Sequence, residues 1–319
     1  MTTSLVLGVN GQDGSYLAQE LLERGHQVVG VGRSPVSRYV RSPQFRYVQL
    51  DICNAEALRD LLNTSSFDQV FHFAVIHGAS DFTYEAVWRE MAAVNLLSLH
   101  VLLEYARTNA INLRIVYAGS RKIFSPPLIG SIDETTPVKA TCLYSIGKIA
   151  ARDLIQYYRT HHGVKGTNVI FFHHESPRRQ PEFLFPTIVR GIVAARHDPK
   201  YRIKVRTLDF WIDWGDAQEY MGIVADLAEM SDEADVMVAS GQSWYARDAV
   251  HHLFSIYGIN PSCLQEASPT NSAASLSFHA VLNRLKQGVG RTPHRQIQDI
   301  ADSIIWSLMR EQSLQRIGT

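Results

Sequence analysis

The sequence predicts an α/β fold, a Rossmann-like doubly wound parallel sheet with a smaller mixed α/β lobe. In the first half of the chain, short β-branched or aromatic runs alternate with longer stretches whose apolar residues recur every three or four positions. Such alternation is typical of a parallel sheet covered by helices. After about Phe172 the rhythm changes, and Pro177, Pro181 and Pro186 interrupt the chain. We therefore divide the chain into a first domain, 1–172, and a smaller lobe, 173–319, from which some chain returns to the first domain.

The elements follow from this alternation in order. Short β-prone runs bounded by polar or turn residues predict strands, and apolar residues at three-and-four spacing predict helices. The predicted strands are 4–8, 27–31, 46–50, 69–73, 113–117 and 166–171. The predicted helices are 15–23, 83–108 and 144–160 in the first domain, and 244–257 and 295–310 in the smaller lobe.

Composition excludes several classes of function. The chain has 31 basic and 31 acidic residues and a pI near 7.2, which argues against binding to nucleic acid or to an anionic membrane. The cysteines Cys53, Cys142 and Cys263 lack the spacing of a zinc site or of a disulfide framework. No apolar run has the length of a signal sequence or a membrane span. We expect a cytoplasmic protein without a bound metal.

A glycine-rich loop follows the first predicted strand and opens the first helix. Glycines at this place allow the backbone to approach a pyrophosphate and the helix to pack closely on the strand. The alternative is a tight strand-to-helix turn without a ligand. The residues that we expect to bind the dinucleotide here are Gly8, Asn10, Gly11, Gln12, Asp13 and Gly14.

The end of the second strand bears on the choice of cofactor. An acidic residue usually holds the adenosine ribose of NAD at this point, but the chain has Arg33 and Ser34, which suit a 2′-phosphate. This favours NADP(H) over NAD(H). Asp51 and Ile52 are placed to contact adenine, and Ala74 belongs to the same set. The alternative for Asp51 is an acidic residue at a helix N-terminus.

A tyrosine and a lysine lie four positions apart on the third predicted helix. Tyr144 and Lys148 therefore share one helix face. An ammonium group near the phenol favours the phenolate, so Tyr144 can exchange the substrate's proton while a hydride moves to or from nicotinamide. Ser120, just after the fifth strand, is placed to orient the substrate.

With these motifs the chain resembles the extended short-chain dehydrogenase/reductase family and, within it, the GDP-mannose 4,6-dehydratases. The resemblance spans roughly residues 4 to 250 and fades towards the C-terminus. Four segments carry it: 8–17 (GVNGQDGSYL), 144–148 (YSIGK), 174–179 (HESPRR) and 213–220 (DWGDAQEY).

The resemblance implies two lobes, bound NADP(H), and oxidation of a nucleotide-linked hexose at C4. In the dehydratases a glutamate then removes the C5 proton and water leaves C6. The resemblance also implies that Ser120, Tyr144 and Lys148 are catalytic and that the loop of Arg178 and Arg179 reaches a neighbouring subunit. The residues expected to contact the cofactor here are Tyr144, Lys148, His174 and Arg179. A homodimer or homotetramer is expected.

The chain departs from the family where the glutamate would stand, since Ser120 is followed by Arg121 and Lys122. Lys122 can serve as a base only if its pKa is strongly lowered; otherwise it points to solvent. Residues that hold the sugar nucleotide are replaced as well: these positions carry Ile212, His173, Thr187 and the run 268–271 (SPTN). Loss of these contacts weakens the case for a GDP-sugar.

Other residues can take over binding of the substrate. Arg190 and Arg206 are candidates for a phosphate, together with Lys200, Arg202 and Lys204, although a solvent-exposed face of an edge strand explains the alternating cations equally. His77 and His173 are candidates for the cleft wall, with ordinary interior histidines as the alternative.

The leading hypothesis is an NADP(H)-dependent oxidoreductase acting at C4 of a nucleotide sugar, by reduction or epimerisation rather than dehydration. One alternative is a dehydratase whose C5 base is another residue. A second is a protein that binds NADP(H) but has lost catalysis. A third is a substrate that carries no nucleotide.

Overall fold

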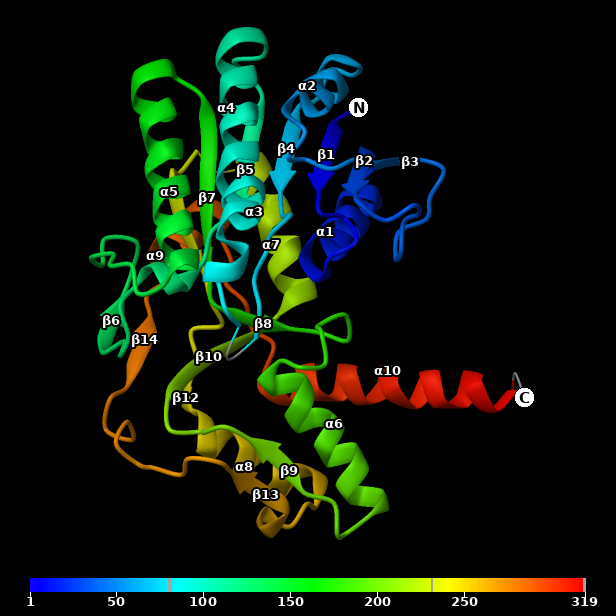
Figure 1. The fold of residues 1–319 in the computed structure, drawn as a ribbon, viewed down its shortest axis with the longest axis vertical. Helices are drawn as coiled ribbons and strands as arrows, with labels where there is room; N and C mark the ends of the chain where they lie inside the picture. Colours follow the sequence, from blue (N-terminus) through cyan, green and yellow to red (C-terminus); the bar gives the residue numbers. More distant parts are fainter. Residues whose placement is uncertain (80–81, 231, 318–319) are drawn as a thin grey trace.

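The computed structural model describes residues 1–79, 82–230 and 232–317. Within them, a seven-stranded parallel sheet has the order β11-β7-β5-β4-β1-β2-β3, which confirms the predicted α/β class (Figure 1). Each of the six predicted strands is present, with both ends within one residue of the prediction. The seventh strand, β11, was not predicted. The strands of the sheet are β1 (Thr3–Leu7), β2 (Gln27–Gly32), β3 (Phe45–Gln49), β4 (Gln69–His72), β5 (Arg114–Ala118), β7 (Lys165–Phe171) and β11 (Asp235–Val238).

Helices cover both faces of this sheet. Because side chains alternate along a strand, Val6 points to one face and Leu5 and Leu7 to the other, and all three are completely buried. The sheet is therefore apolar on both sides, as in other parallel sheets. One face packs against α1 (Gln12–Glu23), α7 (Ala217–Met230) and α9 (Asn283–Val289), and the other against α2 (Ala55–Asn63), α4 (Ser98–Asn109) and α5 (Leu143–His162).

The predicted helix 83–108 is interrupted. It consists of the 3-10 turn η1 (Glu85–Val87), α3 (Trp88–Ala92), a π-helical segment η2 (Ala93–Leu97) and α4. The stretch Glu85–Asn109 is long and apolar enough to cross a membrane, by length and composition only. We had expected no such stretch from the sequence. Leu99, Leu102 and Leu103 are nonetheless buried against the sheet, as is typical of a helix in the core of an α/β domain.

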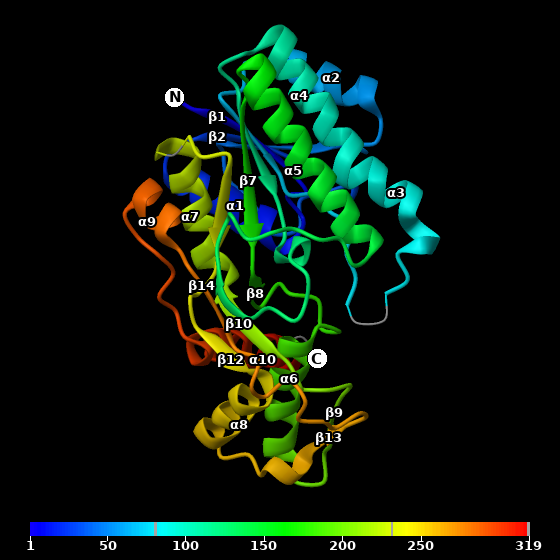
Figure 2. The ribbon, with the colours of Figure 1, turned by 90° about the vertical axis from the view of Figure 1, so that its left-hand side faces the viewer.

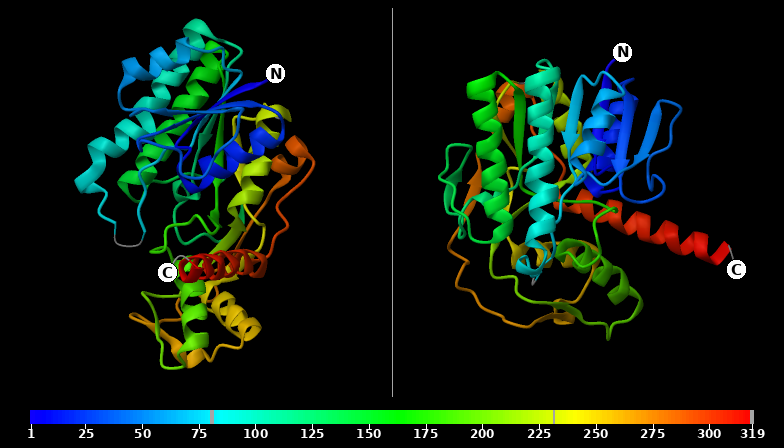
Figure 3. Two further views of the ribbon diagram at one scale, coloured as in Figure 1. Left: turned by 90° about the vertical axis from the view of Figure 1, so that its right-hand side faces the viewer. Right: turned by 45° about the horizontal axis from the view of Figure 1, so that its top comes forward.

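The smaller lobe is built around a three-stranded sheet of order β12-β10-β8 (Figures 1 and 2). Its core joins Phe185, Trp214, Leu253 and Ile300. The helix α10 leaves this core, and its C-terminal part extends beyond the rest of the molecule (Figure 3). The elements of the lobe are β8 (His173–Glu175), α6 (Leu184–His197), β9 (Ile203–Val205), β10 (Trp211–Asp216), β12 (Ser243–Tyr245), α8 (Ala246–Tyr257), η4 (Pro261–Cys263), β13 (Leu264–Glu266) and α10 (Ile297–Ile317).

The chain crosses between the two parts of the molecule several times. After β10 it returns to form α7 and β11, then runs through the smaller lobe as far as β13. The segment 267–277 leads back to β14 (Phe278–Ala280), which pairs with β6 (Gly130–Ile132), and on to α9. The first part of the molecule is thus completed by chain that follows Phe172.

Candidate functional site

The glycine-rich loop joins β1 to α1 at the carboxyl edge of the sheet. Gly8 has φ +88°, and a Cβ atom on it would lie 2.6 Å from the backbone nitrogen of Ala74. A Cβ atom on Gly14 would lie 2.4 Å from the carbonyl oxygen of Gly8. These glycines let β1, β4 and the start of α1 approach one another, and they bring the helix N-terminus to the edge where a phosphate would bind.

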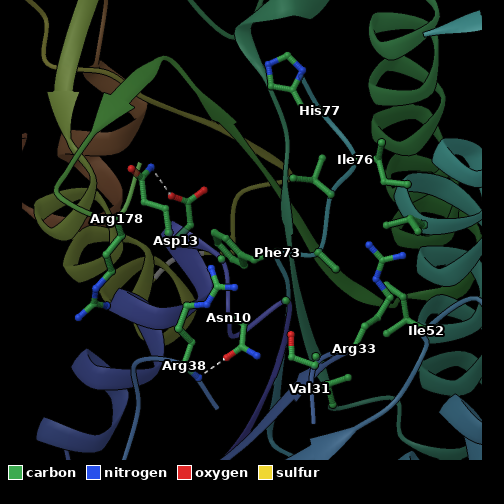
Figure 4. A pocket seen from close by; sticks show the side chains of 18 of the residues that line it. Asn10, Asp13, Val31, Arg33, Arg38, Ile52, Phe73, Ile76, His77 and Arg178 are labelled. Carbon is green, nitrogen blue, oxygen red and sulfur yellow. Dashed lines mark hydrogen bonds between the residues drawn. The ribbon is translucent and has the colours of Figure 1, made fainter. Parts of the chain in front are cut away.

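A cleft of about 370 Å³ opens over this loop (Figure 4). Arg33 and Ile52 lie on one side of it and Asp13 and Arg178 on the other, with Asn10 between them. The predicted cofactor residues that line it are Gly8, Asn10, Gly11, Gln12, Asp13, Arg33, Ser34, Asp51, Ile52, Ala74 and Arg179. Gly14 lies beneath the loop. A cleft with bare backbone at one turn and a helix N-terminus beside it fits a dinucleotide.

The far end of the cleft is open and polar. Arg33 is exposed, and its Nη1 forms an ion pair with Glu90 Oε1 at 3.2 Å. Arg38, which also lines this end, donates its backbone N–H to Asn10 Oδ1 at 2.8 Å. Asp51 accepts the backbone N–H of Cys53 at 3.0 Å and so acts as a cap for the turn. Arg33, Ser34 and Arg38 thus all line the cleft.

A charged pair joins the glycine loop to β8. His174 donates from Nε2 to Asp13 Oδ1 at 3.0 Å and from Nδ1 to the Phe172 carbonyl at 2.8 Å. Both partners are acceptors only, which favours the imidazolium form of His174. Burial opposes ionisation of Asp13, but attraction by His174 and hydrogen bonds from His174 and Gln12 outweigh it and lower the pKa of Asp13 to about 2.

A second, smaller cleft of about 100 Å³ adjoins the first. Both are lined by Asp13, Phe73, Val75, His77 and Arg179. The predicted catalytic residues Ser120, Tyr144, Lys148 and Lys122 line the smaller cleft together, along with His173 and His174. Residues from the ends of β5 and β7 and from the first turns of α5 therefore meet beside the dinucleotide cleft.

Lys148 is only 2% exposed, and its contacts differ from the predicted ones. Its Nζ donates to Tyr117 Oη at 3.0 Å and to the Ala118 carbonyl at 2.6 Å, and it lies 5.5 Å from the centre of the Tyr144 ring. Burial lowers the pKa of Lys148 to about 7. Burial also raises the pKa of Tyr144 above its usual value, although the Ser120 hydroxyl opposes this. Tyr144 is therefore a neutral phenol at neutral pH in this structure.

An aromatic group forms the wall behind Tyr144. The rings of His77 and Tyr144 stack with their centres 4.4 Å apart, and Tyr84 Oη is hydrogen bonded to His77 Nδ1 at 2.7 Å. Neither Tyr84 nor Tyr117 was predicted, because an isolated tyrosine in a sequence carries no signal of the partner that it meets in the fold.

The comparisons with known proteins agree with this geometry. The sequence model described as GDP-mannose 4,6 dehydratase matches residues 5–284. The chain belongs to the GDP-mannose 4,6-dehydratase family. This family is part of the extended short-chain dehydrogenase/reductase group of enzymes, which confirms the resemblance expected from the four motifs.

Curated members of the GDP-mannose 4,6-dehydratase family share little more than a quarter of their residues with the chain. A GDP-mannose 4,6-dehydratase from Sordaria araneosa is 28% identical over 264 residues, which cover 80% of this chain and 48% of that protein. GDP-mannose 4,6 dehydratase 1 from Arabidopsis thaliana is 28% identical over 277 residues, covering 81% of this chain and 75% of that protein. The chain thus spans about half the length of the first relative.

Solved structures of related enzymes share the fold. The dTDP-glucose 4,6-dehydratase from Bacillus anthracis, in complex with NAD, superimposes with a TM-score of 0.82 at 13% identity, covering 98% of each chain. UDP-glucuronic acid 4-epimerase from Bacillus cereus, also in complex with NAD, gives a TM-score of 0.80 at 16% identity, covering 97% of this chain and 99% of that one.

Arg121 and Lys122, which stand where the resemblance led us to expect a glutamate, both line the smaller cleft. Lys122 is half-buried, and its Nζ lies 5.8 Å from the Tyr84 ring centre and 5.9 Å from the Tyr144 ring centre. Burial lowers the pKa of Lys122, and repulsion from Arg121 adds to this. The lysine therefore lies beside the catalytic set rather than in bulk solvent.

Two residues that we predicted to bind the substrate lie elsewhere. Arg190 is exposed on α6, and Arg206 is exposed just after β9. Neither lines either cleft. Lys204 is exposed on β9 between the buried Ile203 and the half-buried Val205, so these cations lie on a solvent-facing surface, as in the alternative we considered. Their role as substrate ligands stays a prediction.

Arg178 and Arg179 contact their own chain. Arg178 donates to Ser15 Oγ and Gln19 Oε1, each at 2.8 Å, and its guanidinium lies 3.8 Å from the centre of the Tyr16 ring. Arg179 stacks on Phe183 and forms an ion pair with Glu175 at 3.5 Å. The expected homodimer or homotetramer and the cytoplasmic location stay predictions.

Proposed function

We propose that the protein is an NADP(H)-dependent oxidoreductase that transfers a hydride at a hydroxyl or ketone of a nucleotide sugar, at C4. The net reaction is reduction or epimerisation rather than dehydration. One observation carries the proposal: Ser120, Tyr144 and Lys148 share a cleft that opens directly into the dinucleotide cleft. Membership of the family and the names of its curated members support the sugar nucleotide.

The residues of this chain supply the proton chemistry. A bound nicotinamide would supply the acceptor or donor of the hydride. Oxidation at C4 removes the carbon-bound hydrogen with two electrons and sends the hydroxyl proton to Tyr144 Oη, and reduction reverses both transfers. Because burial keeps Tyr144 protonated, the structure favours the direction in which Tyr144 donates. Ser120 orients the oxygen, and the Lys148 ammonium is placed to stabilise a phenolate as it forms.

Dehydration is disfavoured because, among the described residues that line the cleft, no carboxylate is suited to act as the base. Removal of the C5 proton needs a group that accepts a proton, and the place of the family's glutamate is taken by Lys122. The carboxylate that lines the smaller cleft, Asp13, has its pKa held at about 2 by His174 and Gln12, so it is too weak a base for this step.

The preference for NADP(H) rests on Arg33, Ser34 and Arg38 at the open end of the cleft. A 2′-phosphate gains charge-assisted hydrogen bonds there. Titration of NADPH and NADH into the wild type and Arg33→Ala tests this. The variant should bind NADPH about tenfold more weakly and NADH unchanged. Equal losses for both nucleotides would contradict the preference.

Mass spectrometry tests the reaction. The purified protein is incubated with NADP(H) and GDP-mannose, and with UDP-glucose in parallel, while substrate mass and cofactor oxidation are followed beside Tyr144→Phe. Because both sugars carry a hydroxyl at C4, we expect the hydride transfer to appear in reverse, as oxidation to the 4-ketosugar with reduction of NADP+, or as an unchanged mass with altered stereochemistry that NMR of the product resolves. The rate should be about a hundredfold or more lower in the variant. Loss of one water without net change of cofactor would show dehydration. Tight NADPH binding without turnover of any sugar nucleotide would overturn the proposal.

A further inference from the structure

The smaller cleft carries more positive than negative charge. Four cations line it, namely Arg121, Lys122, Lys148 and Arg179, whereas Asp13 is its only lining carboxylate within the described residues. Asp13 is already paired with His174. These cations act on the neighbouring His173. Burial and repulsion from Arg121, Arg179 and Lys122 hold the pKa of His173 well below its usual value. His173 is therefore neutral at neutral pH.

Two of these cations form neither an ion pair nor a side-chain hydrogen bond in the part of the chain that the structure describes. Across 1–79, 82–230 and 232–317, neither Arg121 nor Lys122 forms an ion pair or a side-chain hydrogen bond. The Nε of Arg121 is buried without a hydrogen-bond partner, as is Nδ1 of His173. The nearby buried carboxylate of Asp213 accepts the backbone N–H groups of Ser240 and Gly241 instead, at 2.8 and 2.9 Å.

The Arg121 guanidinium lies half-buried at the cleft, and its Nε is sequestered without a hydrogen-bond partner. Burial lowers the pKa of Arg121 only to about 10, with Asp213 opposing the shift, so the group remains charged at neutral pH. Burial of a charge is tolerated where a counter-charge or several hydrogen bonds compensate for lost hydration. Asp213 attracts Arg121 but forms no ion pair or hydrogen bond with it, so a bound anion would complete this site.

The position of the cations places the anion close to the reacting carbon. Arg121 and Lys122 follow Ser120 directly in the 3-10 turn η3 (Arg121–Ile123), and Lys122 Nζ lies 5.9 Å from the Tyr144 ring centre. Resting on the proposed function, we propose that Arg121 and Lys122 bind a carboxylate carried by the sugar ring itself. The substrate is then a nucleotide-linked hexuronate rather than a neutral hexose.

Chemistry and position favour a carboxylate on the ring over the diphosphate. A guanidinium can hold a carboxylate with two parallel hydrogen bonds. Both cations line the same cleft as Ser120 and Tyr144, where the reacting ring lies under the proposed function. A hexuronate also has no hydroxyl at C6 and so cannot lose water there, which accounts for the absence of the family's glutamate at Lys122.

Matched pairs of ligands test the inference. UDP-glucuronate is compared with UDP-glucose, and GDP-mannuronate with GDP-mannose, so that the members of each pair differ only at C6. Calorimetric binding to the protein saturated with NADPH and, separately, kcat/KM are measured for both. We expect the uronate of at least one pair to bind at least about tenfold more tightly than its neutral partner.

Three variants sharpen the test. Arg121→Gln and Lys122→Gln should each remove most of the preference for the uronate and leave binding of the neutral sugar within about twofold. Arg59→Gln, an exposed arginine on α2, is the control for net charge and should keep the preference. If Arg121→Gln fails to fold, as judged by its melting curve, the half-buried Lys122 still provides the measurement.

The outcomes separate this inference from the proposed function. Equal binding and turnover of acidic and neutral sugars would overturn the carboxylate site and leave the oxidoreductase standing. Equal weakening of UDP, UDP-glucose and UDP-glucuronate in Arg121→Gln would show that the cations bind the diphosphate, which also overturns it. Preferential uronate binding without turnover would support the site and overturn the proposed function.

Discussion

At the scale of single residues, Lys148 carries a charge into the interior of the first domain. Its Nζ has two acceptors, Tyr117 Oη and the Ala118 carbonyl, and neither is a carboxylate. Burial lowers its pKa from 10.5 to about 7, so the unfolded chain binds more protons than the folded one between these two values. Lys148 therefore lowers the free energy of unfolding by its full amount below about pH 7, and this destabilisation decreases as the pH rises towards 10.5.

Lys148→Met should therefore raise stability while it abolishes hydride transfer. We expect Tm, measured by calorimetry, to rise by about 2 °C or more near pH 6, and the gain to shrink near pH 9. Lys286→Met, at an exposed position on α9, should show no such dependence on pH. A lower Tm of Lys148→Met at both pH values would mean that the hydrogen bonds of Lys148 outweigh its burial.

Tyr117 bridges Lys148 to the π-helical segment. Its hydroxyl donates to the Asn95 carbonyl at 2.6 Å and accepts from Lys148. Burial raises the pKa of Tyr117 well above 10, so it stays a phenol and its lone pair remains available to the ammonium group. Tyr117 is in this way a positioning residue for Lys148.

Tyr117→Phe should remove that acceptor and lower the pKa of Lys148 further. In a pH profile of kcat/KM, the limb that reports Lys148 should move to lower pH, with a loss of about tenfold in kcat. Tyr105→Phe also removes a hydroxyl hydrogen bond, to the Leu62 carbonyl at 3.0 Å in a half-buried position. Tyr105 lies outside the clefts, so this variant should leave the profile unchanged. A loss of rate without a shifted limb would indicate packing alone.

At the scale of elements, two helical glycines have opposite roles. A Cβ atom on Gly14 of α1 would meet the Gly8 carbonyl at 2.4 Å, whereas one on Gly222 of α7 would meet nothing closer than 3.5 Å. The first glycine is required by the close approach of helix and loop. The second has no such requirement and weakens its helix, because glycine is a poor helix former.

Gly14→Ala should therefore lower the free energy of unfolding by about 1 to 3 kcal/mol and weaken NADPH binding at least about tenfold. Gly222→Ala should raise stability by about 0.5 to 1 kcal/mol and leave binding unchanged. Urea unfolding and fluorescence titration of NADPH measure both. Equal stability changes in the two variants would show that the loop yields around the added methyl group.

The elements differ in how far the sequence predicts them. The six strands are predicted because each is a short run rich in β-branched or aromatic residues and bounded by turns, which is a local property. The π-helical segment is missed because its register depends on Asn95, whose side chain holds Ile76 through the backbone N–H at 3.0 Å and the carbonyl at 3.2 Å. The short strands of the smaller lobe, such as β9 with its three residues, are too brief for a periodic pattern.

The same distinction applies to the site. The glycine loop and the pair Tyr144 and Lys148 are spaced along one element, so the sequence places them close together. The contact of Asp13 with His174 joins residues 161 positions apart. Arg121 has no direct ion pair with Asp213 because the Asp213 carboxylate accepts the backbone N–H groups of Ser240 and Gly241 instead. No spacing in the sequence reports either arrangement.

At the scale of the whole molecule, the segment 267–277 links the smaller lobe to the first domain, and Asp209 anchors it. The Asp209 carboxylate accepts hydrogen bonds from the Thr270 hydroxyl, from the Ser272 N–H at 2.9 Å and from the Ala273 N–H at 2.9 Å. The hydrogen bond from Thr270 is the main reason that the pKa of Asp209 is lowered. Asp209 thus supplies several of the hydrogen bonds that hold the segment, beside those of Arg247 with Asn271 and of Trp211 with the Ala273 carbonyl.

Asp209→Ala should release this link. Limited proteolysis should cut within 267–277 at least about tenfold faster than in the wild type, because exposed backbone without hydrogen bonds is the preferred site of cleavage. Asp198→Ala removes an exposed carboxylate that caps only Lys200, at 2.8 Å, and should cut at the wild-type rate. Mass spectrometry of the fragments locates the cut, and unchanged cleavage would show that the segment is held by its other contacts.

The order of the strands also leaves one edge of β7 unpaired during part of synthesis. β7 pairs with β5 on one edge, but its other edge waits for β11, which begins 64 positions after Phe171 at Asp235. Until then the backbone of Val169 and Ile170 is unpaired, and an unpaired apolar edge invites association between nascent chains. A translational pause before β11 would lengthen that exposure, so chaperone demand should depend on codon choice between these two strands.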